Sequence, residues 1–347
     1  MFEKLRQNKE LWNLFTKEEE YNPAILDKHR RFPYYLSKNK NVLEQEVSKF
    51  LIENGFKTKY PENKKFAVCL THDVDALYIS KRVAVIKTLS LLKRYKFKKA
   101  LNTFKIVFGR INKKWNPLRN FEKIMELEQK YNAKSTFYFL ANNRGKFHPN
   151  YNIKDLQAEL KSISKNGWEV GLHGSYDAYD NLDQIRKEKD RLEQILGKEI
   201  VGYRNHYLRF KTPDTWELLS KAGFKYDTTF GYAGMVGFRN GMCHPFKPFN
   251  LNTNKEINVL EIPLTIMDGT LFDYMKLDME GAWKIVKLLI DITEENNGVI
   301  TILWHNRFFD DLFNQDKREF YERILDYCSK KNAWMTNGEE IWKHYEN

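Results

Sequence analysis

Cysteine is scarce in this chain, and long apolar runs are absent. Its 347 residues include three cysteines, Cys69, Cys243 and Cys328, an odd number at wide spacing without a Cys-x-x-Cys pair. A disulfide framework and a cysteine-ligated zinc site are therefore not expected. No stretch approaches the about 18 uncharged apolar residues of a membrane span, and the N-terminus lacks the apolar run of a signal peptide. We accordingly expect a cytoplasmic protein.

Several catalytic signatures are also missing. The sequence contains no Gly-x-Ser-x-Gly, no Gly-x4-Gly-Lys-[Ser/Thr] and no Gly-x-Gly-x-x-Gly after a strand, so serine–histidine and phosphate-loop mechanisms have no support. The net charge is +12, but no RNP, zinc-finger or helix-turn-helix signature accompanies it, and no nucleic-acid partner is expected. The 42% apolar and 30% charged residues fit a globular protein with a substantial core.

Acidic residues are absent from one segment, residues 76–121, which holds thirteen Lys or Arg with apolar residues interleaved. We predict a basic helical insertion at about 78–120. Its basic part, 81–119, fits a solvated cationic helix packed on the body of the protein. It also fits a helix on an anionic membrane surface, which would place the protein peripherally on the inner face of the membrane. Contact with nucleic acid is the third interpretation, and charge alone suggests it.

Short apolar runs alternate with helix-like stretches along most of the chain. The apolar runs are 66–70, 135–140, 168–174, 200–206, 224–232, 259–267, 299–306 and 333–337. The helix-like stretches are 120–131, 152–167, 181–197, 212–223, 279–297 and 316–332. This alternation predicts an α/β fold with a mainly parallel sheet, and seven or eight repeats favour a closed or nearly closed barrel. Helical spacing before it predicts an N-terminal helical extension, 1–62, ahead of a catalytic domain, 63–347.

Polar residues capable of chemistry follow four of the predicted strands. They read Thr-His-Asp-Val-Asp (71–75), His-Gly-Ser-Tyr-Asp (173–177), Tyr-Arg-Asn-His (203–206) and Trp-His-Asn (304–306). In β/α folds, sites gather at the carboxyl ends of the strands. We therefore expect these four clusters to converge on one rim.

The first two clusters suggest a metal site. In an extended segment Asp73 and Asp75 point the same way, and a cation between two carboxylates, or a proton on one, relieves their repulsion. His173 is a candidate neutral imidazole ligand, and Asp177 lies within reach of the same ion if the chain turns helically. The alternatives are an Asx turn with a capping aspartate and a structural histidine.

The other two clusters carry an arginine and a histidine. Arg204 and Arg209 stand among apolar neighbours, and buried arginine usually pairs with a carboxylate. Arg204 therefore either forms a structural ion pair or orients Asp73. His305 is either a general acid or a histidine at the edge of the core. The remaining histidines are expected to be structural or surface residues, namely His29, His148, His244 and His344.

Taken in order, the four clusters resemble the motifs of the polysaccharide deacetylase superfamily (NodB homology, carbohydrate esterase family 4) over about residues 65–340. The form is similar to deacetylase-like proteins of bacterial surface-polysaccharide biosynthesis. The resemblance implies a distorted (β/α)7-8 barrel that removes an N-acetyl group from an amino sugar with the help of a divalent metal, most often zinc. In such an enzyme Asp73 would be the base, Asp75 and His173 metal ligands, Arg204 the partner of Asp73, and His305 the acid.

The sequence departs from the family pattern in its second motif. Asp177 stands where a second histidine is usual, and His206 stands where the third motif usually has proline. Either residue is a candidate third ligand, with His206 favoured because imidazole is the more usual zinc ligand. An acidic residue that would tune the acid histidine is not evident, and Asp268 and Asp227 are the candidates for it.

The substrate that these features imply is an N-acetylated sugar, and a cytoplasmic location favours one linked to a nucleotide or a lipid carrier. The phosphates of such a carrier would suit the basic segment. The altered second motif leaves an alternative, a catalytically degraded carbohydrate-binding protein on the same fold. A hydrolase of another amide or of an O-acetyl ester is the third candidate.

Overall fold

A parallel sheet forms the centre of the protein in the computed structural model, which describes residues 2–108, 116–310 and 312–346. Its hydrogen-bonded order is β8-β5-β4-β3-β2-β1-β10-β9, with β11 paired to β1. The strands are β1 (Ala67–Val74), β2 (Thr136–Leu140), β3 (Glu169–Gly174), β4 (Gly202–Asn205), β5 (Tyr226–Asp227), β8 (Leu260–Glu261), β9 (Leu264–Met267), β10 (Val299–Leu303) and β11 (Trp334–Thr336). Each falls on one of the eight predicted apolar runs, since β8 and β9 share the run 259–267.

The two ends of this strand order are joined by the chain itself. β8 pairs with β5, β9 pairs with β10, and only Ile262 and Pro263 separate β8 from β9. Proline lacks the backbone N–H that a ladder requires, which accounts for the break between the two strands. The sheet therefore curls round until its two end strands, β8 and β9, are neighbours in the chain. The predicted distorted barrel is confirmed.

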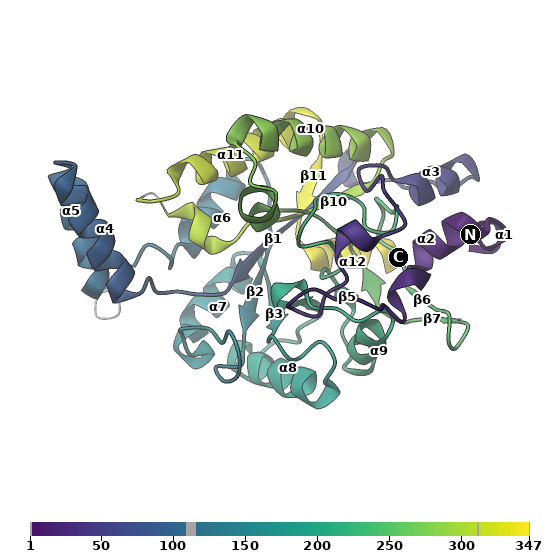
Figure 1. Ribbon diagram of the computed structural model, residues 1–347, viewed down its shortest axis with the longest axis horizontal. Coiled ribbons are helices and arrows are strands. Elements are labelled where there is room, and N and C mark those ends of the chain that lie inside the picture. Colours follow the sequence, from purple (N-terminus) through teal and green to yellow (C-terminus); the bar gives the residue numbers. More distant parts are fainter. Residues whose placement is uncertain (1, 109–115, 311, 347) are drawn as a thin grey trace.

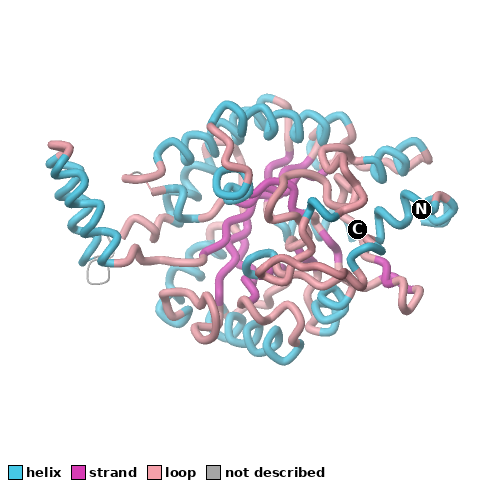
Figure 2. The backbone as a smooth tube through the Cα atoms, viewed as in Figure 1, coloured by secondary structure: helices cyan, strands magenta, loops and turns pink. Residues whose placement is uncertain are grey.

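Helices cover the outside of the strands (Figures 1 and 2). They are α6 (Phe121–Gln129), α7 (Gln157–Lys165), α8 (Leu182–Leu196), α9 (Asp214–Lys221), α10 (Met279–Glu295) and α11 (Gln315–Lys330). α12 (Gly338–Glu346) instead packs through Ile341 with a second apolar cluster that includes Cys69 and Tyr226. α8 illustrates the local signals that set their ends. The Asn181 side chain accepts a hydrogen bond from the Gln184 N–H, and Gly197 ends the helix at a φ of 77°.

The first strand is held by a buried acid. Glu128 of α6 accepts hydrogen bonds from the His72 ring (Nε2, 2.9 Å), the Tyr321 hydroxyl (2.7 Å) and the Trp168 indole (2.5 Å). A buried carboxylate is tolerated when several donors satisfy it. The cluster ties α6, β1 and α11 together and so fixes the strand that carries Asp73.

The N-terminal helices pack against the barrel. These helices are α1 (Phe2–Gln7), α2 (Lys9–Thr16) and α3 (Glu46–Glu53), which lie together on one side of the molecule (Figure 1). Leu5, Phe15 and Val47 belong to the same apolar core as the strands. A buried ion pair adds to this contact, because Arg239 donates to Glu20 through Nε (3.0 Å) and Nη2. The extension is thus anchored by both apolar and ionic contacts.

We expect Glu20→Ala to destabilise the protein strongly. The substitution would leave the Arg239 guanidinium buried without its partner, a loss worth about 3–5 kcal/mol for ion pairs of this kind. Urea denaturation of wild type and variant gives the difference in the free energy of unfolding. Glu18→Ala, at an exposed position two residues earlier, is the matched control and should change it by less than about 0.5 kcal/mol. Equal effects of the two substitutions would contradict the prediction.

A helical hairpin projects from the barrel between β1 and α6. It consists of α4 (Lys81–Lys93) and α5 (Phe97–Lys105), which stand away from the other helices (Figure 1). Among the residues that the structure describes, no helix combines the length and apolar character needed to cross a bilayer.

Candidate functional site

Five of the predicted site residues meet in one cavity at the carboxyl ends of the strands. Asp73 lies in β1 and Asp75 directly follows it, His173 lies in β3, and His206 and His305 follow β4 and β10. All five line a cavity of about 540 Å³. The expected convergence on one rim is therefore observed, and it arises because parallel strands present their carboxyl ends on the same side.

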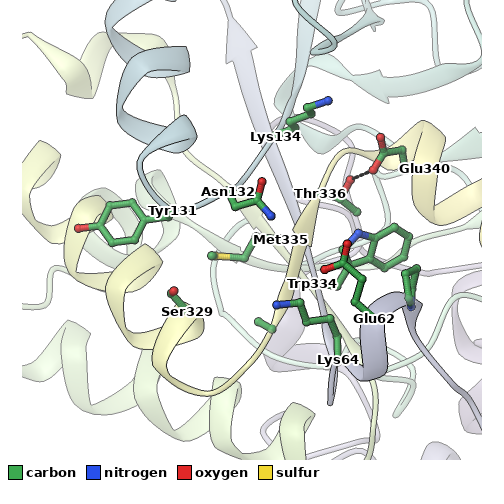
Figure 3. A pocket seen from close by; sticks show the side chains of 12 residues that line it. Glu62, Lys64, Tyr131, Asn132, Lys134, Ser329, Trp334, Met335, Thr336 and Glu340 are labelled. Carbon is green, nitrogen blue, oxygen red and sulfur yellow. Dashed lines mark hydrogen bonds between the residues drawn. The ribbon is translucent and has the colours of Figure 1, made fainter.

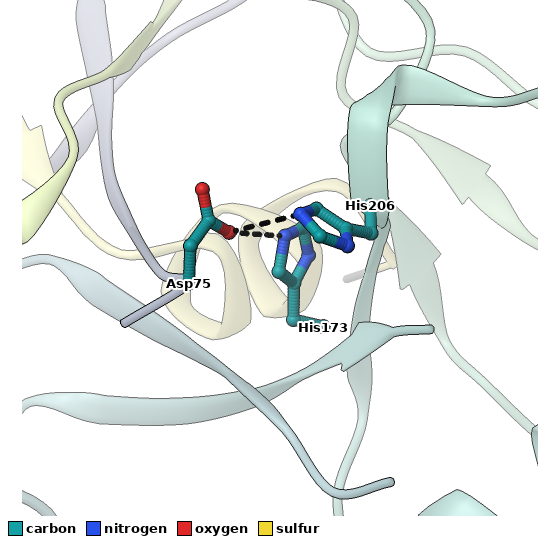
Figure 4. A group of neighbouring side chains, drawn as sticks. All are labelled: Asp75, His173 and His206. Atoms are coloured by element: carbon teal, nitrogen blue, oxygen red, sulfur yellow. Dashed lines mark ion pairs between the residues drawn. The ribbon is translucent and has the colours of Figure 1, made fainter. Parts of the chain in front are cut away.

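Asp75, His173 and His206 form the closest group in this cavity (Figure 4). The Asp75 Oδ1 atom lies 3.2 Å from His173 Nε2 and 3.4 Å from His206 Nε2. The candidate ligand atoms of the three residues all lie within 4.8 Å of one another. One carboxylate and two imidazoles at this spacing match the three protein ligands of many catalytic zinc sites.

The hydrogen bonds around the group suit a cation. His173 Nδ1 lies 2.9 Å from the Arg204 carbonyl oxygen, which can only accept a hydrogen bond, so the proton belongs on Nδ1 and the Nε2 lone pair faces Asp75. Within the described part of the chain, Asp75 Oδ1 and His206 Nδ1 are buried without a hydrogen-bond partner. Burial lowers the pKa of His206 to about 4, so its imidazole is neutral at pH 7. The donor set therefore fits a divalent metal.

The imidazoles keep Asp75 ionised. Burial alone would raise the pKa of Asp75, but His206, His173 and His305 outweigh it and hold the pKa well below its ordinary value. For His173 the net shift of the pKa is upward. Burial acts to lower the pKa of His173, and the charges of Asp73 and Asp75 raise it above its ordinary value. Asp75 is thus held as a carboxylate, the form that a metal ligand requires.

Asp73 lies beside this group with Arg204 behind it. Its Oδ2 atom is 3.6 Å from His173 Nε2, and its Oδ1 atom is 3.7 Å from Arg204 Nε. Arg204 is fully buried and donates to the hydroxyls of Thr228 (3.1 Å) and Thr71 (2.9 Å). Those bonds fix the guanidinium, which places a positive charge next to Asp73 without a direct hydrogen bond to it.

His305 is held by Asp268. The Asp268 Oδ1 atom is 2.7 Å from His305 Nδ1, and its Oδ2 atom accepts the backbone N–H of His305 at 2.5 Å. Burial acts to lower the pKa of His305, and Asp268 more than offsets it, so the net shift is upward. His305 Nε2 then faces Asp75 Oδ2 at 3.5 Å. The other acidic candidate, Asp227, is buried and accepts a hydrogen bond from Thr229.

Asp177 lies apart from the imidazoles. Its side chain is 65% exposed and accepts a hydrogen bond from Arg209 Nη1 at 2.8 Å. It is therefore His206, and not Asp177, that lies beside Asp75 and His173. Arg209 proves to be a buried arginine with a carboxylate partner, as its apolar neighbours suggested.

The cavity wall also includes aromatic and cationic residues, and among them Tyr207 belongs to the third motif of the sequence, Arg-x-x-Tyr (204–207). Tyr207 has a φ of 62°, and its carbonyl oxygen accepts a hydrogen bond from Arg31 Nη1 at 2.8 Å. Phe147 and Tyr274 are partly exposed beside it. Lys28, Arg31 and Arg307 supply positive charge. Lys28 and Arg31 come from the N-terminal extension, whereas Phe147, Tyr274 and Arg307 follow three different strands, so no single local pattern links them.

A smaller cavity, of about 280 Å³, lies at the opposite end of the barrel (Figure 3). Its walls include Lys64, Lys134 and Trp334, which lie at or just before the starts of β1, β2 and β11, and Glu340 of α12. In β/α barrels this end serves stability, whereas chemistry occurs at the carboxyl ends. We therefore place the functional site in the larger cavity.

Comparison with known proteins gives matches to proteins described as deacetylases. The family model described as polysaccharide deacetylase matches residues 112–226. A peptidoglycan deacetylase of Helicobacter pylori is 30% identical over 112 residues, and a peptidoglycan deacetylase-like protein of Gibberella zeae is 32% identical over 90 residues. These matches cover 30% and 24% of this chain, and 35% and 26% of those proteins. The chain thus matches about a third or less of the length of either relative.

The solved structures extend the likeness to most of the chain. A candidate polysaccharide deacetylase from Mycobacterium smegmatis superposes with a TM-score of 0.55 at 20% sequence identity. The superposition covers 83% of this chain and 93% of that one, and at this identity it supports the barrel fold. Residues 112–226 thus match the polysaccharide deacetylase family, and the fold of most of the chain agrees with that of the superposed structure.

Proposed function

We propose that this protein is a metal-dependent hydrolase that removes the N-acetyl group from an amino sugar. The observation that carries the proposal is the meeting of Asp75, His173 and His206 in one cavity with Asp73 and His305. A ligand set, a carboxylate and a histidine at one rim are the parts that amide hydrolysis requires.

The metal would be held by Asp75, His173 and His206, and zinc is the first choice because tetrahedral nitrogen and oxygen ligands suit it. When bound, such an ion polarises the acetyl carbonyl and lowers the pKa of water to about 7. A fourth position facing the cavity would remain for the substrate or water.

Two side chains near that position would each carry out one proton transfer. Asp73 would take a proton from the attacking water, while the buried Arg204 guanidinium holds a positive charge beside the carboxylate. A carbon–oxygen bond forms first between the water oxygen and the acetyl carbonyl carbon, and the carbon–nitrogen bond breaks afterwards. His305 would donate the proton from Nε2 to the departing nitrogen, because an amine anion is too poor a leaving group. The products are acetate and the free amino sugar.

The walls of the cavity support a sugar that carries a phosphate. Phe147, Tyr207 and Tyr274 offer flat apolar surfaces against which a sugar ring can pack. Lys28, Arg31 and Arg307 offer charges that suit a phosphate group. We therefore favour a nucleotide-linked or lipid-linked N-acetyl sugar, in a cytoplasmic step of surface-polysaccharide biosynthesis.

We expect the purified protein to release acetate only when metal is present. It should be incubated with a panel of N-acetylated sugars that are free, nucleoside-diphosphate-linked or polyprenyl-linked. A chelator should abolish acetate release, and one equivalent of zinc should restore it. Sugar binding by calorimetry without any acetate release from the zinc-loaded protein would instead establish the alternative, a binding protein without turnover. Release from O-acetyl esters alone would overturn the N-deacetylase assignment.

A further inference from the structure

The hairpin of α4 and α5 is packed in an unusual way. The two helices lie against each other, and the residues buried between them are small, namely Ala84 and Thr88 of α4 and Ala100 and Thr103 of α5. Both threonine hydroxyls donate to carbonyl oxygens of their own helix, four residues earlier. Close packing through small residues with internally satisfied polar groups is typical of helix pairs in an apolar medium.

The large apolar side chains of the hairpin point outward. On the α5 side, Phe97, Leu101, Phe104 and Phe108 recur at helical spacing and form one stripe, and they are 41–63% exposed. Ala100 and Thr103 occupy the face of α5 toward α4, and the stripe lies to one side of that face. Tyr95, at the turn between the helices, is 82% exposed.

Positive charge surrounds this stripe. Lys98 and Lys105 lie on α5 beside it, Lys99 lies on another face of the same helix, and no acidic residue occurs anywhere from 76 to 121. On α4, exposed Val85, Ile86 and Leu89 are likewise interleaved with basic residues. Apolar anchors flanked by cations match an anionic lipid surface, where the apolar groups enter the boundary of the acyl chains and the cations meet phosphates.

The exposed apolar stripe of α5 does not pack against the barrel. Figure 1 shows it standing clear of the other helices, and a contact that reaches the body is made by Lys87 of α4, whose ammonium lies 3.6 Å from the centroid of the Phe313 ring. The expectation that a cationic helix simply packs on the barrel therefore does not account for the exposed apolar side chains of α5.

The base of the hairpin is fastened to the functional site. Asn306, which directly follows His305, donates from Nδ2 to the carbonyl oxygens of Ala76 (3.1 Å) and Leu118 (3.0 Å). Asn120 in turn donates to the Asn306 carbonyl at 2.9 Å. Both ends of the insertion are thus held at the rim where the cavity opens.

We propose that the α4–α5 hairpin docks the protein onto an anionic lipid bilayer. Phe97, Leu101 and Phe104 enter the interface, and the lysines beside them contact lipid phosphates. At 1.5 Å per residue the thirteen residues of α4 span about 20 Å, less than the about 30 Å hydrocarbon core. The hairpin therefore lies in the interface and does not cross the membrane. Nucleic acid would explain the lysines but not the apolar stripe.

Sedimentation with vesicles tests the proposal. We expect full-length protein to pellet with vesicles of phosphatidylcholine and phosphatidylglycerol, and to stay in the supernatant with phosphatidylcholine alone. Raising the salt from about 0.05 M to about 0.5 M should weaken binding, because it screens the lysines. Equal binding to both vesicles, or binding to neither, would overturn the proposal.

Two variants separate the contributions of charge and apolar surface. The triple variant K98E/K99E/K105E should weaken binding on the order of 100-fold, since each lysine near such a surface contributes about fivefold. F97S/L101S/F104S should also abolish pelleting, although its charge is unchanged. The matched control is K154E/K161E/K165E, which alters three lysines of the η6–α7 region (153–165) and should bind like wild type. Loss of binding in the control would show that net charge alone is responsible.

A further variant distinguishes lipid from self-association. In Phe97→Trp the new indole should shift its emission to the blue with anionic vesicles, and brominated lipids should quench it. Light scattering after size exclusion should show the same mass for wild type and for F97S/L101S/F104S. A wild-type dimer that this variant dissociates, with no vesicle-dependent shift, would overturn the proposal in favour of a second copy of the chain.

Discussion

Asp73→Asn should lower kcat by about 10²–10⁴-fold, the usual contribution of a general base, without loss of the bound metal. Asparagine has nearly the same shape as aspartate but cannot accept a proton from water. Asp73 lies 3.6 Å from His173 and outside the group of Asp75, His173 and His206, so that group should keep its affinity for zinc. Metal content by elemental analysis and kcat from acetate release give the two readouts.

Asp155→Asn is the control for this substitution, because it makes the same chemical change at an exposed position away from the cavity. It should leave both readouts at the wild-type level. Turnover of Asp73→Asn within a few-fold of wild type would remove Asp73 from the role of base, while loss of metal would make Asp73 a ligand.

His206→Ala should reduce the affinity for zinc by more than about 100-fold, because changes to residues around metal ligands alone cost about 10–100-fold. Acetate release should fall with it at limiting zinc. The substitution removes one of two imidazoles and leaves a cavity that water fills. Titration with zinc in a competition assay against a fluorescent chelator measures the change in Kd.

Asp177→Asn decides between the two candidates for the third ligand. Its carboxylate is exposed and bound to Arg209, so this variant should bind zinc as wild type does. The opposite pattern, with zinc lost in Asp177→Asn and retained in His206→Ala, would mean that the segment after β3 turns inward when metal binds.

The sequence identified the strands and the rim because both depend on local pattern. Buried parallel strands read as short apolar runs, and polar residues at their carboxyl ends are forced onto one side of the barrel. Asp268 follows the same rule, since it comes directly after β9, yet no neighbouring motif marks it, and its pairing with His305 is visible only in three dimensions.

Other features depend on contacts that no local pattern encodes. Arg31 approaches Tyr207 from a segment 176 residues earlier in the chain. Asp177 and Arg209 find each other because α8 and its flanking loops bring β3 and β4 into register. The basic segment was evident from its composition, but whether its apolar residues face inward or outward depends on how α4 and α5 pack together.

The clamp made by Asn306 gives the protein a modular construction. The Asn306 side-chain amide holds the chain where it enters the hairpin, at Ala76, close to where it leaves it, at Leu118. The hairpin is therefore attached to the barrel at one place. We expect that it can be exchanged by grafting while the ring of strands and the cavity stay intact. The hairpin and the cavity are therefore separable parts of the molecule.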